Sequence, residues 1–164
     1  MKLLIGIPTM DFVHVEFMKC LCALIQRLRD EKVNFDLDIN SGTLVYLARE
    51  RIAHRAINEE YTHVLWLDSD MVFQPSLLDD LMFSGKGFVT GIYHARRKGY
   101  ASCIFKSIEI NKIERFEKYP SETFEIAGCG FGCVLMKTDV LMDVQAKFNV
   151  MFGPIKGMGE DLSF

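Results

Sequence analysis

The sequence lacks several features that would each assign a protein to a broad class. No apolar run approaches the roughly 20 residues that a membrane-spanning helix needs, and the mean hydropathy is only +0.12. There is no basic excess either, because 19 Lys and Arg residues stand against 22 Asp and Glu residues, for a net charge of −3. No internal repeat or low-complexity stretch interrupts the chain. These absences argue against a membrane span, against the basic surface of a nucleic-acid-binding protein and against a disordered linker.

Cysteine occurs, but not in the patterns of a disulfide framework or a zinc module. The number is odd, and the cysteines sit inside apolar runs, which favours a reducing compartment and predicts a cytoplasmic protein. Cys20 and Cys22 are two residues apart, and Cys129 and Cys133 are four apart, so no Cys-x-x-Cys pair is present. We therefore interpret them as small core residues, with a zinc site as the alternative.

What the chain does have is the length and composition of one globular domain. It contains 164 residues, of which 49% are hydrophobic and 25% charged. Its N-terminus superficially resembles a signal peptide. However, the apolar stretch Leu3–Ile7 is shorter than a signal peptide requires, and no small-residue cleavage site follows it. We expect this stretch to be a buried first strand.

Apolar patterning predicts an alternation of strands and helices in the first part of the chain. Strands are expected over residues 3–7, 33–40, 63–67 and 87–92, and helices over 14–29, 43–60 and 75–82. Such alternation is typical of an α/β protein with a mainly parallel sheet. Ser41 or Thr43 is expected to cap the second helix.

The pattern changes after residue 92. Strands are expected over 101–105, 108–116 and 133–136, and a helix over 138–146 that Thr138 would cap. A glycine-rich bend over 128–132 precedes the strand at 133–136. This part predicts a smaller, antiparallel addition to the sheet.

Two carboxylates follow the third strand directly. Asp68 and Asp70 are separated by one residue, and ligands of parallel sheets bind beyond the carboxyl ends of the strands. Carboxylate oxygens are hard ligands that suit Mg²⁺ or Mn²⁺. The pattern therefore indicates a divalent-cation site; a solvated turn or a helix cap is the alternative.

Three arginines, Arg49, Arg51 and Arg55, lie on the expected second helix. One of them near a phosphate-binding edge would offset the charge of a diphosphate. The alternative is that they form salt bridges with Glu50, Glu59 and Glu60.

Two further segments are candidates for chemistry. Gly128, Gly130 and Gly132 alternate, which lets a ligand or another backbone approach closely, as a substrate wall or as a structural bulge. No Lys-Ser/Thr follows them, so this is not a phosphate-binding loop of the Walker type. Near the C-terminus, Glu160 and Asp161 follow glycine-rich breaks. Such a carboxylate can act as a general base, or it can be a solvated acidic pair.

Taken in this order, the elements resemble the A-type fold of glycosyltransferases, in the large inverting family that uses nucleotide-sugar donors. The motifs that carry the resemblance are Ile5–Thr9, Leu47–Arg51, Leu65–Phe73, Gly128–Met136 and Gly159–Leu162. The resemblance covers nearly the whole chain. It implies a three-layer α/β/α, Rossmann-like fold, with a nucleotide-binding part over about 1–92 and an acceptor-side part over about 93–164.

The resemblance also implies roles for individual residues. Thr9 and the end of the second strand (Asp36, Asp38 or Asn40) would border the nucleoside base, and Arg49 would lie near the donor diphosphate. Asp68 would contact the ribose or the metal shell, and Asp70 would ligate Mn²⁺ or Mg²⁺. Gly130 and Phe131 would wall the sugar and acceptor pocket. Asp161 would deprotonate the acceptor hydroxyl, and Glu160 would help to hold the acceptor.

The implied substrates are a nucleotide sugar, with a UDP-sugar expected first, and an acceptor glycan or other hydroxyl compound. Two features depart from the family pattern. Glu50 stands where such enzymes often carry Asn. No histidine follows Asp161, and the sequence ends at Phe164, so we expect an incomplete acceptor side and metal shell.

Two other functions fit the same residues. Leu65–Val72 also resembles the strand-end signature of haloacid-dehalogenase-like phosphotransferases, in which Asp68 would be the nucleophile and Asp70 the acid. That family places its signature on the first strand, whereas two strand–helix units precede it here. The third interpretation is a non-catalytic, truncated nucleotide-sugar binder.

Overall fold

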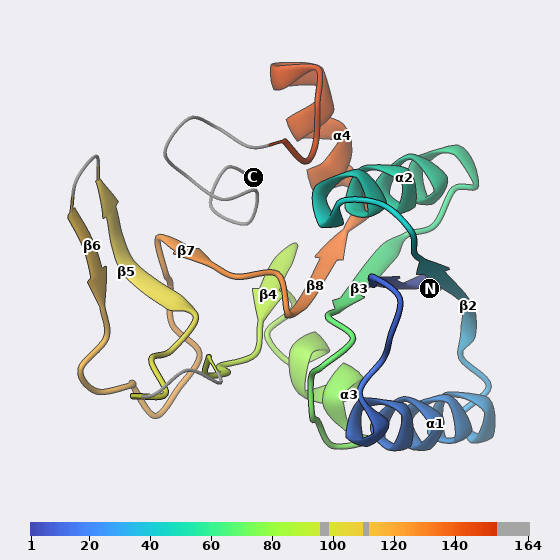
Figure 1. Cartoon of the computed structure of the whole chain (residues 1–164), viewed down its shortest axis with the longest axis horizontal. Coiled ribbons are helices and arrows are strands. Elements are labelled where there is room, and N and C mark those ends of the chain that lie inside the picture. The colour runs from blue at the N-terminus through green and yellow to red at the C-terminus, as the bar shows by residue number, and fades with distance from the viewer. Residues whose placement is uncertain (96–98, 110–111, 154–164) are drawn as a thin grey trace.

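The computed structural model of the chain describes residues 1–95, 99–109 and 112–153 (Figure 1). The first half consists of β1 (Lys2–Pro8), α1 (Val15–Asp30), β2 (Asn34–Asn40), α2 (Val45–Asn58), β3 (His63–Leu67), α3 (Leu77–Met82) and β4 (Phe88–Thr90). The second half adds β5 (Ile104–Glu109), β6 (Lys112–Arg115), β7 (Gly128–Cys129), β8 (Cys133–Lys137) and α4 (Thr138–Phe148). None of the helices in the described residues is long and apolar enough to cross a membrane.

The main sheet is mixed rather than mainly parallel. Its strand order is β2-β1-β3-β8-β4. β1 pairs in parallel with both β2 and β3, as the alternating pattern predicts. β8 is inserted between β3 and β4 and is antiparallel to both. The expectation of an α/β sheet is therefore confirmed, while half of the pairings that build it are antiparallel.

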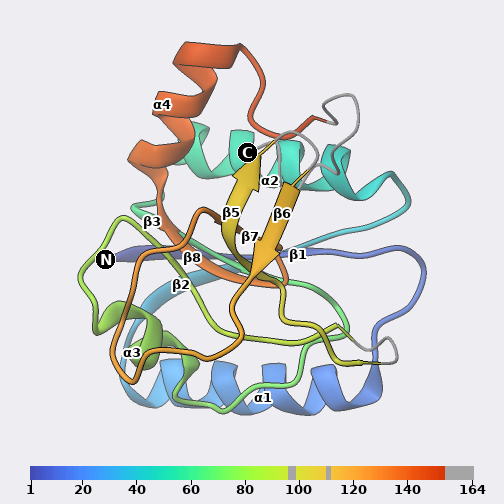
Figure 2. The same ribbon diagram turned by 90° about the vertical axis from the view of Figure 1, so that its left-hand side faces the viewer.

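Helices cover both faces of this sheet. Leu3, Ile5 and Ile7 of β1 face α1 and α3, together with alternate residues of β3 and β8. The intervening positions, such as Leu4 and Trp66, pack against α2 and α4. Figure 2 shows the resulting three layers, with α1 and α3 on one side of the sheet and α2 and α4 on the other. This arrangement leaves the strand ends as the exposed edge where a ligand can bind.

A three-stranded antiparallel sheet, in the order β6-β5-β7, stands beside the main sheet (Figure 1). It confirms the expected antiparallel addition, but its strands differ from the expected ranges. The single strand expected over 108–116 is wrong, because β5 ends at Glu109 and β6 begins at Lys112, and the two pair as antiparallel strands.

The helix starts differ slightly from the sequence expectations. α2 begins after Leu44 and α4 after Lys137, and neither N-cap residue makes a side-chain capping bond. The expected capping by Ser41, Thr43 or Thr138 is therefore wrong. Thr138 is instead buried as the first residue of α4.

Candidate functional site

The candidate site lies where β1, β2 and β3 end. Because these three strands are parallel, Thr9, Asn40 and Asp68 follow or close their carboxyl ends at one edge of the sheet. β8 runs in the opposite direction, so the bend that precedes it reaches the same edge. There the backbone N–H of Asp68 donates to the carbonyl of Gly132 at 3.0 Å.

A buried arginine is the central feature of this edge. Arg49, in the first half of α2, has only 2% of its surface exposed. Its Nη2 donates to Oδ1 of Asp68 at 2.9 Å, and its guanidinium carbon lies 5.4 Å from the ring centre of Phe131. The Asp68 side chain is 34% exposed, so the pair extends from the core to solvent. A guanidinium is the group that best matches a phosphate, which makes this a candidate anion-binding position.

Asp68 and Asp70 belong to a turn at the end of β3. The N–H of Met71 donates to the carbonyl of Asp68 at 3.1 Å, and the N–H of His14 donates to the carbonyl of Ser69 at 2.9 Å. Asp70 is exposed. The turn is thus held by its own backbone and by the chain that enters α1, which fixes both carboxylates near the sheet edge.

The donor set of this turn fits a hard divalent cation. Within residues 1–95, 99–109 and 112–153, no three His, Cys, Asp or Glu side chains gather in a way that could hold a metal ion. Mg²⁺ nevertheless binds proteins through one or two carboxylates, with waters and substrate phosphates completing its shell. Asp68 and Asp70 supply the hard oxygens that such a site requires.

Thr9 is buried at the end of β1, with 6% of its surface exposed. Its N–H donates to the carbonyl of Asn40 at 3.0 Å, and its Oγ1 donates to the carbonyl of Phe12 at 2.9 Å. Thr9 therefore connects the ends of β1 and β2 and shapes the loop that follows. It borders the edge expected for a nucleoside base.

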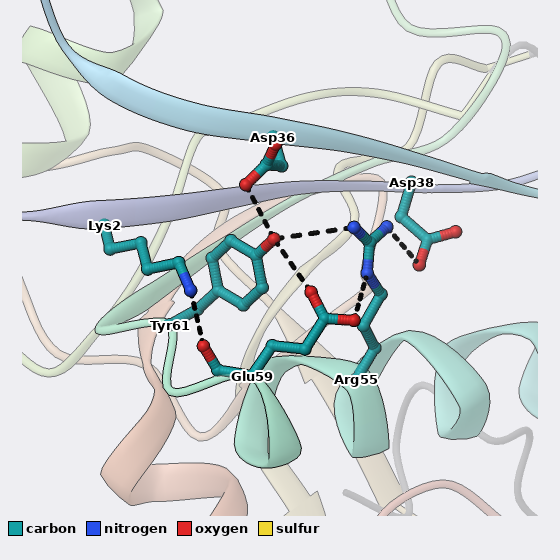
Figure 3. A network of polar contacts seen from close by, with 6 residues as sticks. All are labelled: Lys2, Asp36, Asp38, Arg55, Glu59 and Tyr61. Atoms are coloured by element: carbon teal, nitrogen blue, oxygen red, sulfur yellow. Dashed lines mark hydrogen bonds and ion pairs between the residues drawn. The ribbon is translucent and has the colours of Figure 1, made fainter.

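Asp38, in contrast, is engaged in a separate network near the end of α2 (Figure 3). Arg55 donates to Oδ2 of Asp38 and to Oε1 of Glu59, each at 3.1 Å. The Tyr61 hydroxyl donates to Oδ2 of Asp36 at 2.7 Å. Arg55 follows Arg49 by six residues, which is about 9 Å along a helix. Asp38 is thus held by Arg55 rather than by the Arg49–Asp68 pair.

The alternating glycines make room for a tyrosine ring. A Cβ on Gly132 would lie 2.9 Å from Cε2 and Cζ of Tyr93, and one on Gly130 would overlap the Tyr93 hydroxyl. The Gly132 N–H also donates to that hydroxyl at 2.8 Å. The close packing of the Tyr93 ring therefore explains the glycines at positions 130 and 132 in structural terms. Tyr93 is also a neighbour of the site that sequence reasoning did not identify.

Cys133 begins β8 next to this bend and is buried. Burial, with a smaller contribution from the nearby Asp68 carboxylate, raises the pKa of its thiol to about 11, although a hydrogen bond from the Gly91 backbone acts in the opposite direction. The thiol is therefore protonated at neutral pH. Cys129 and Cys133 are buried packing residues, as the sequence interpretation expected, whereas the same interpretation is wrong for Cys22, which is exposed.

A cavity of about 1000 Å³ lies on the other side of Phe131. Its walls come from α3, β4, β5 and residues 120–129, and they include Leu81, Phe88, Ile104 and Phe124. Phe131 contributes to this wall and also carries the guanidinium of Arg49. It thus stands between the charged edge and a hollow large enough for a small organic molecule.

Two predicted site residues cannot be compared with the structure. Glu160 and Asp161 lie outside the described residues. Glu50, which the sequence marked only as a departure from a family pattern, has a defined contact: its carboxylate accepts backbone N–H groups from Met151 and Phe152.

Comparison with known proteins supports the fold alone. No protein-family model matches the sequence, and no curated protein matches it significantly. Among solved structures, A197 from STIV is similar, with a TM-score of 0.60 and 22% sequence identity. The match covers 100% of this chain and 76% of A197. The chain thus shares the α/β architecture of A197 over its whole length.

Proposed function

We propose that this protein is a glycosyltransferase that binds a nucleoside-diphosphate sugar at the Arg49–Asp68 edge and transfers the sugar to an acceptor hydroxyl. The proposal joins the motif resemblance to A-type glycosyltransferases with an α/β fold of the expected class. The observation that carries it is the ion pair of a nearly inaccessible arginine with the first carboxylate of the Asp-Ser-Asp turn.

Arg49 suits the diphosphate of the donor. It is held by Asp68 at 2.9 Å and by the Phe131 ring, so its charge is already fixed in place beneath the edge before an anion arrives. A positive charge fixed at this edge stabilises the nucleoside diphosphate as it departs, which is where charge accumulates in the transition state.

Asp68 and Asp70 would hold Mg²⁺ or Mn²⁺ against the same diphosphate. When bound, the cation supplies further positive charge to the leaving group. Asp70 is exposed, so it can reach a cation without leaving its turn. Asp68 would share its carboxylate between this cation and Arg49.

The acceptor would occupy the cavity beyond Phe131, whose volume of about 1000 Å³ is ample for a sugar unit. In this proposal Asp161 takes the proton from the acceptor hydroxyl, and Glu160 helps to orient the acceptor. UDP-sugars are the first donors to test.

Thermal stability in the presence of nucleotides tests the donor site. A ligand that binds only the folded state stabilises it by about 2.7 kcal/mol at a concentration of 100 times Kd. We expect UDP to raise the Tm of the wild type when Mn²⁺ is present. Asp70→Asn should lose most of this rise, while the exposed helix residue Asp143, changed to Asn, serves as the matched control.

Two outcomes would contradict the proposal. An equal UDP-dependent rise in Asp70→Asn would remove Asp70 from the metal site. A beryllium fluoride adduct on Asp68, with no nucleotide effect, would instead favour the phosphotransferase alternative.

For the transfer step, Asp161→Asn should abolish turnover and leave UDP binding unchanged.

A further inference from the structure

After α4 the chain turns back onto α2 through residues 149–152, and this segment ends among the aromatic side chains of the core. Asn149 ends α4 in a left-handed conformation, with φ of 62°. Val150 is exposed, whereas Met151 and Phe152 are each only 2% exposed.

The carboxylate of Glu50 holds this segment by its backbone. Its Oε2 accepts the N–H of Met151 at 3.1 Å and the N–H of Phe152 at 2.7 Å. Its Oε1 lies 3.3 Å from Nε2 of His54, one turn further along α2. The side chain is 19% exposed. Hydrogen bonds from two consecutive amides to one ionised, largely buried acceptor are strong and directional.

The held segment is connected to the candidate site by contacts between rings. The Phe152 ring centre lies 5.2 Å from that of Trp66 and 5.1 Å from that of Phe131. Phe131 in turn lies 5.4 Å from the guanidinium carbon of Arg49, which pairs with Asp68. A shift of Phe152 would therefore be felt at the wall on which Arg49 rests.

From these contacts we infer that Glu50 is a positioning residue, which anchors residues 151–152 and thereby holds Phe152 against Phe131, the ring on which Arg49 rests. The inference rests on the proposed function, in which Arg49 faces the diphosphate of the donor. Gln at this position loses the charge that strengthens the two hydrogen bonds, although its carbonyl oxygen can still accept them, whereas Ala removes every acceptor.

The test uses the complete chain with Glu50→Gln or Glu50→Ala, and with Glu16→Gln as a matched control. Glu16 is an exposed glutamate of α1 that pairs with Lys19 on the same helix. In Glu50→Gln, we expect the amides of Met151 and Phe152 to exchange with deuterium at least about tenfold faster, with the β3 amides unchanged. Trp66 is the only tryptophan in the sequence and is fully buried, so its acrylamide quenching should rise about twofold in the same variant.

Turnover with a UDP-sugar supplies the second readout. We expect kcat/KM to fall about 10- to 100-fold in Glu50→Gln, because the variant releases the ring on which Arg49 rests and displaces the charge that faces the diphosphate. Glu50→Asp, which keeps the charge, should recover part of both effects; it also replaces Glu50→Gln if that variant does not fold.

Each way of failing has its own signature. Unchanged exchange and quenching in both Glu50→Gln and Glu50→Ala would show that Glu50 does not hold the segment. Faster exchange with unchanged kcat/KM would show that the held segment does not position Arg49 for the reaction. A wild type that neither binds UDP nor turns over would overturn the proposed function itself, while exchange and quenching would still decide whether Glu50 anchors residues 151–152.

Discussion

Arg49 illustrates how neighbouring groups stabilise a charge that the fold buries. A guanidinium removed from water costs several kcal/mol unless a partner compensates it. Asp68 is that partner at 2.9 Å, and the Phe131 ring provides a second favourable contact. The same carboxylate is a candidate ligand for a cation. Its negative charge is thus required by the fold even before a ligand binds.

We predict that Asp68→Asn lowers the free energy of unfolding by about 1–3 kcal/mol, since it removes a charge-assisted hydrogen bond from a buried arginine. Urea unfolding followed by Trp66 fluorescence measures this change. The exposed residue Asp143, changed to Asn, should differ from the wild type by no more than about 0.5 kcal/mol. If both variants were equally stable, the ion pair would not contribute to folding.

Individual site residues differ in how far sequence alone could predict them. Asp68 follows an apolar strand, so its place at the sheet edge was predictable from a local pattern. For the arginines, the salt-bridge alternative holds for Arg55, which contacts Glu59, one turn away. The partner of Arg49 is Asp68, 19 residues away, and such a pairing depends on how α2 packs against β3. Non-local packing is also why Tyr93 and Glu50 escaped prediction.

At the scale of elements, α2 approaches the sheet closely because β1 carries a glycine beneath it. A Cβ on Gly6 would lie 2.7 Å from Cγ2 of Ile52 and 3.3 Å from Cε3 of Trp66. No Cβ fits there unless the helix or these side chains move. This contact sets the distance between α2 and the sheet, and with it the position of Arg49 relative to the strand ends.

Gly6→Ala should therefore cost about 1–3 kcal/mol through overpacking. Adding Ile52→Ala removes the obstructing methyl. The double variant should therefore lose about 1 kcal/mol less unfolding free energy than the sum of the two single losses. Gly87→Ala is the control, because its nearest contact would be an ordinary 3.7 Å from Cγ2 of Val140. If the stability losses of Gly6→Ala and Ile52→Ala were strictly additive, the contact between these residues would not set the distance between α2 and the sheet.

The network at the end of α2 links that helix to β2 through Tyr61 and Arg55 (Figure 3). Burial raises the pKa of the Tyr61 phenol, and its hydrogen bond to Asp36 raises it further. The folded state therefore keeps this proton at a pH where the unfolded chain releases it. Its contribution to stability is complete below the ordinary tyrosine pKa of about 10 and declines as the pH rises above that value.

The corresponding prediction concerns alkaline unfolding. Between about pH 9 and pH 11, the free energy of unfolding should fall more steeply in the wild type than in Tyr61→Phe. Tyr100→Phe, which removes an exposed phenol, should follow the wild type. Urea titrations at several pH values give the free energy of unfolding as a function of pH. Parallel curves for Tyr61→Phe and the wild type would show that the Tyr61 phenol does not cause the steeper fall.

At the scale of the whole molecule, β8 determines how the two parts of the chain combine. The alternating strands and helices predicted β1, β2 and β3 as parallel neighbours, and this is confirmed. The reversed insertion of β8 was not predictable, because the apolar run Cys133–Met136 suits a buried strand of either direction. Its position is set by pairing with β3 and β4, which are distant in sequence.

This arrangement predicts that residues 1–92 do not fold by themselves. Without β8, β4 loses its pairing partner and β3 keeps only β1, and Trp66 loses its contacts with Phe131 and Phe152. A fragment of residues 1–92 should show no cooperative urea transition and a red-shifted Trp66 emission, and adding residues 93–164 should restore both properties. The intact chain is the reference for each measurement. Cooperative unfolding of the fragment with a buried Trp66 would instead mean that residues 1–92 are an independent folding unit, and that β8 only extends a sheet already formed.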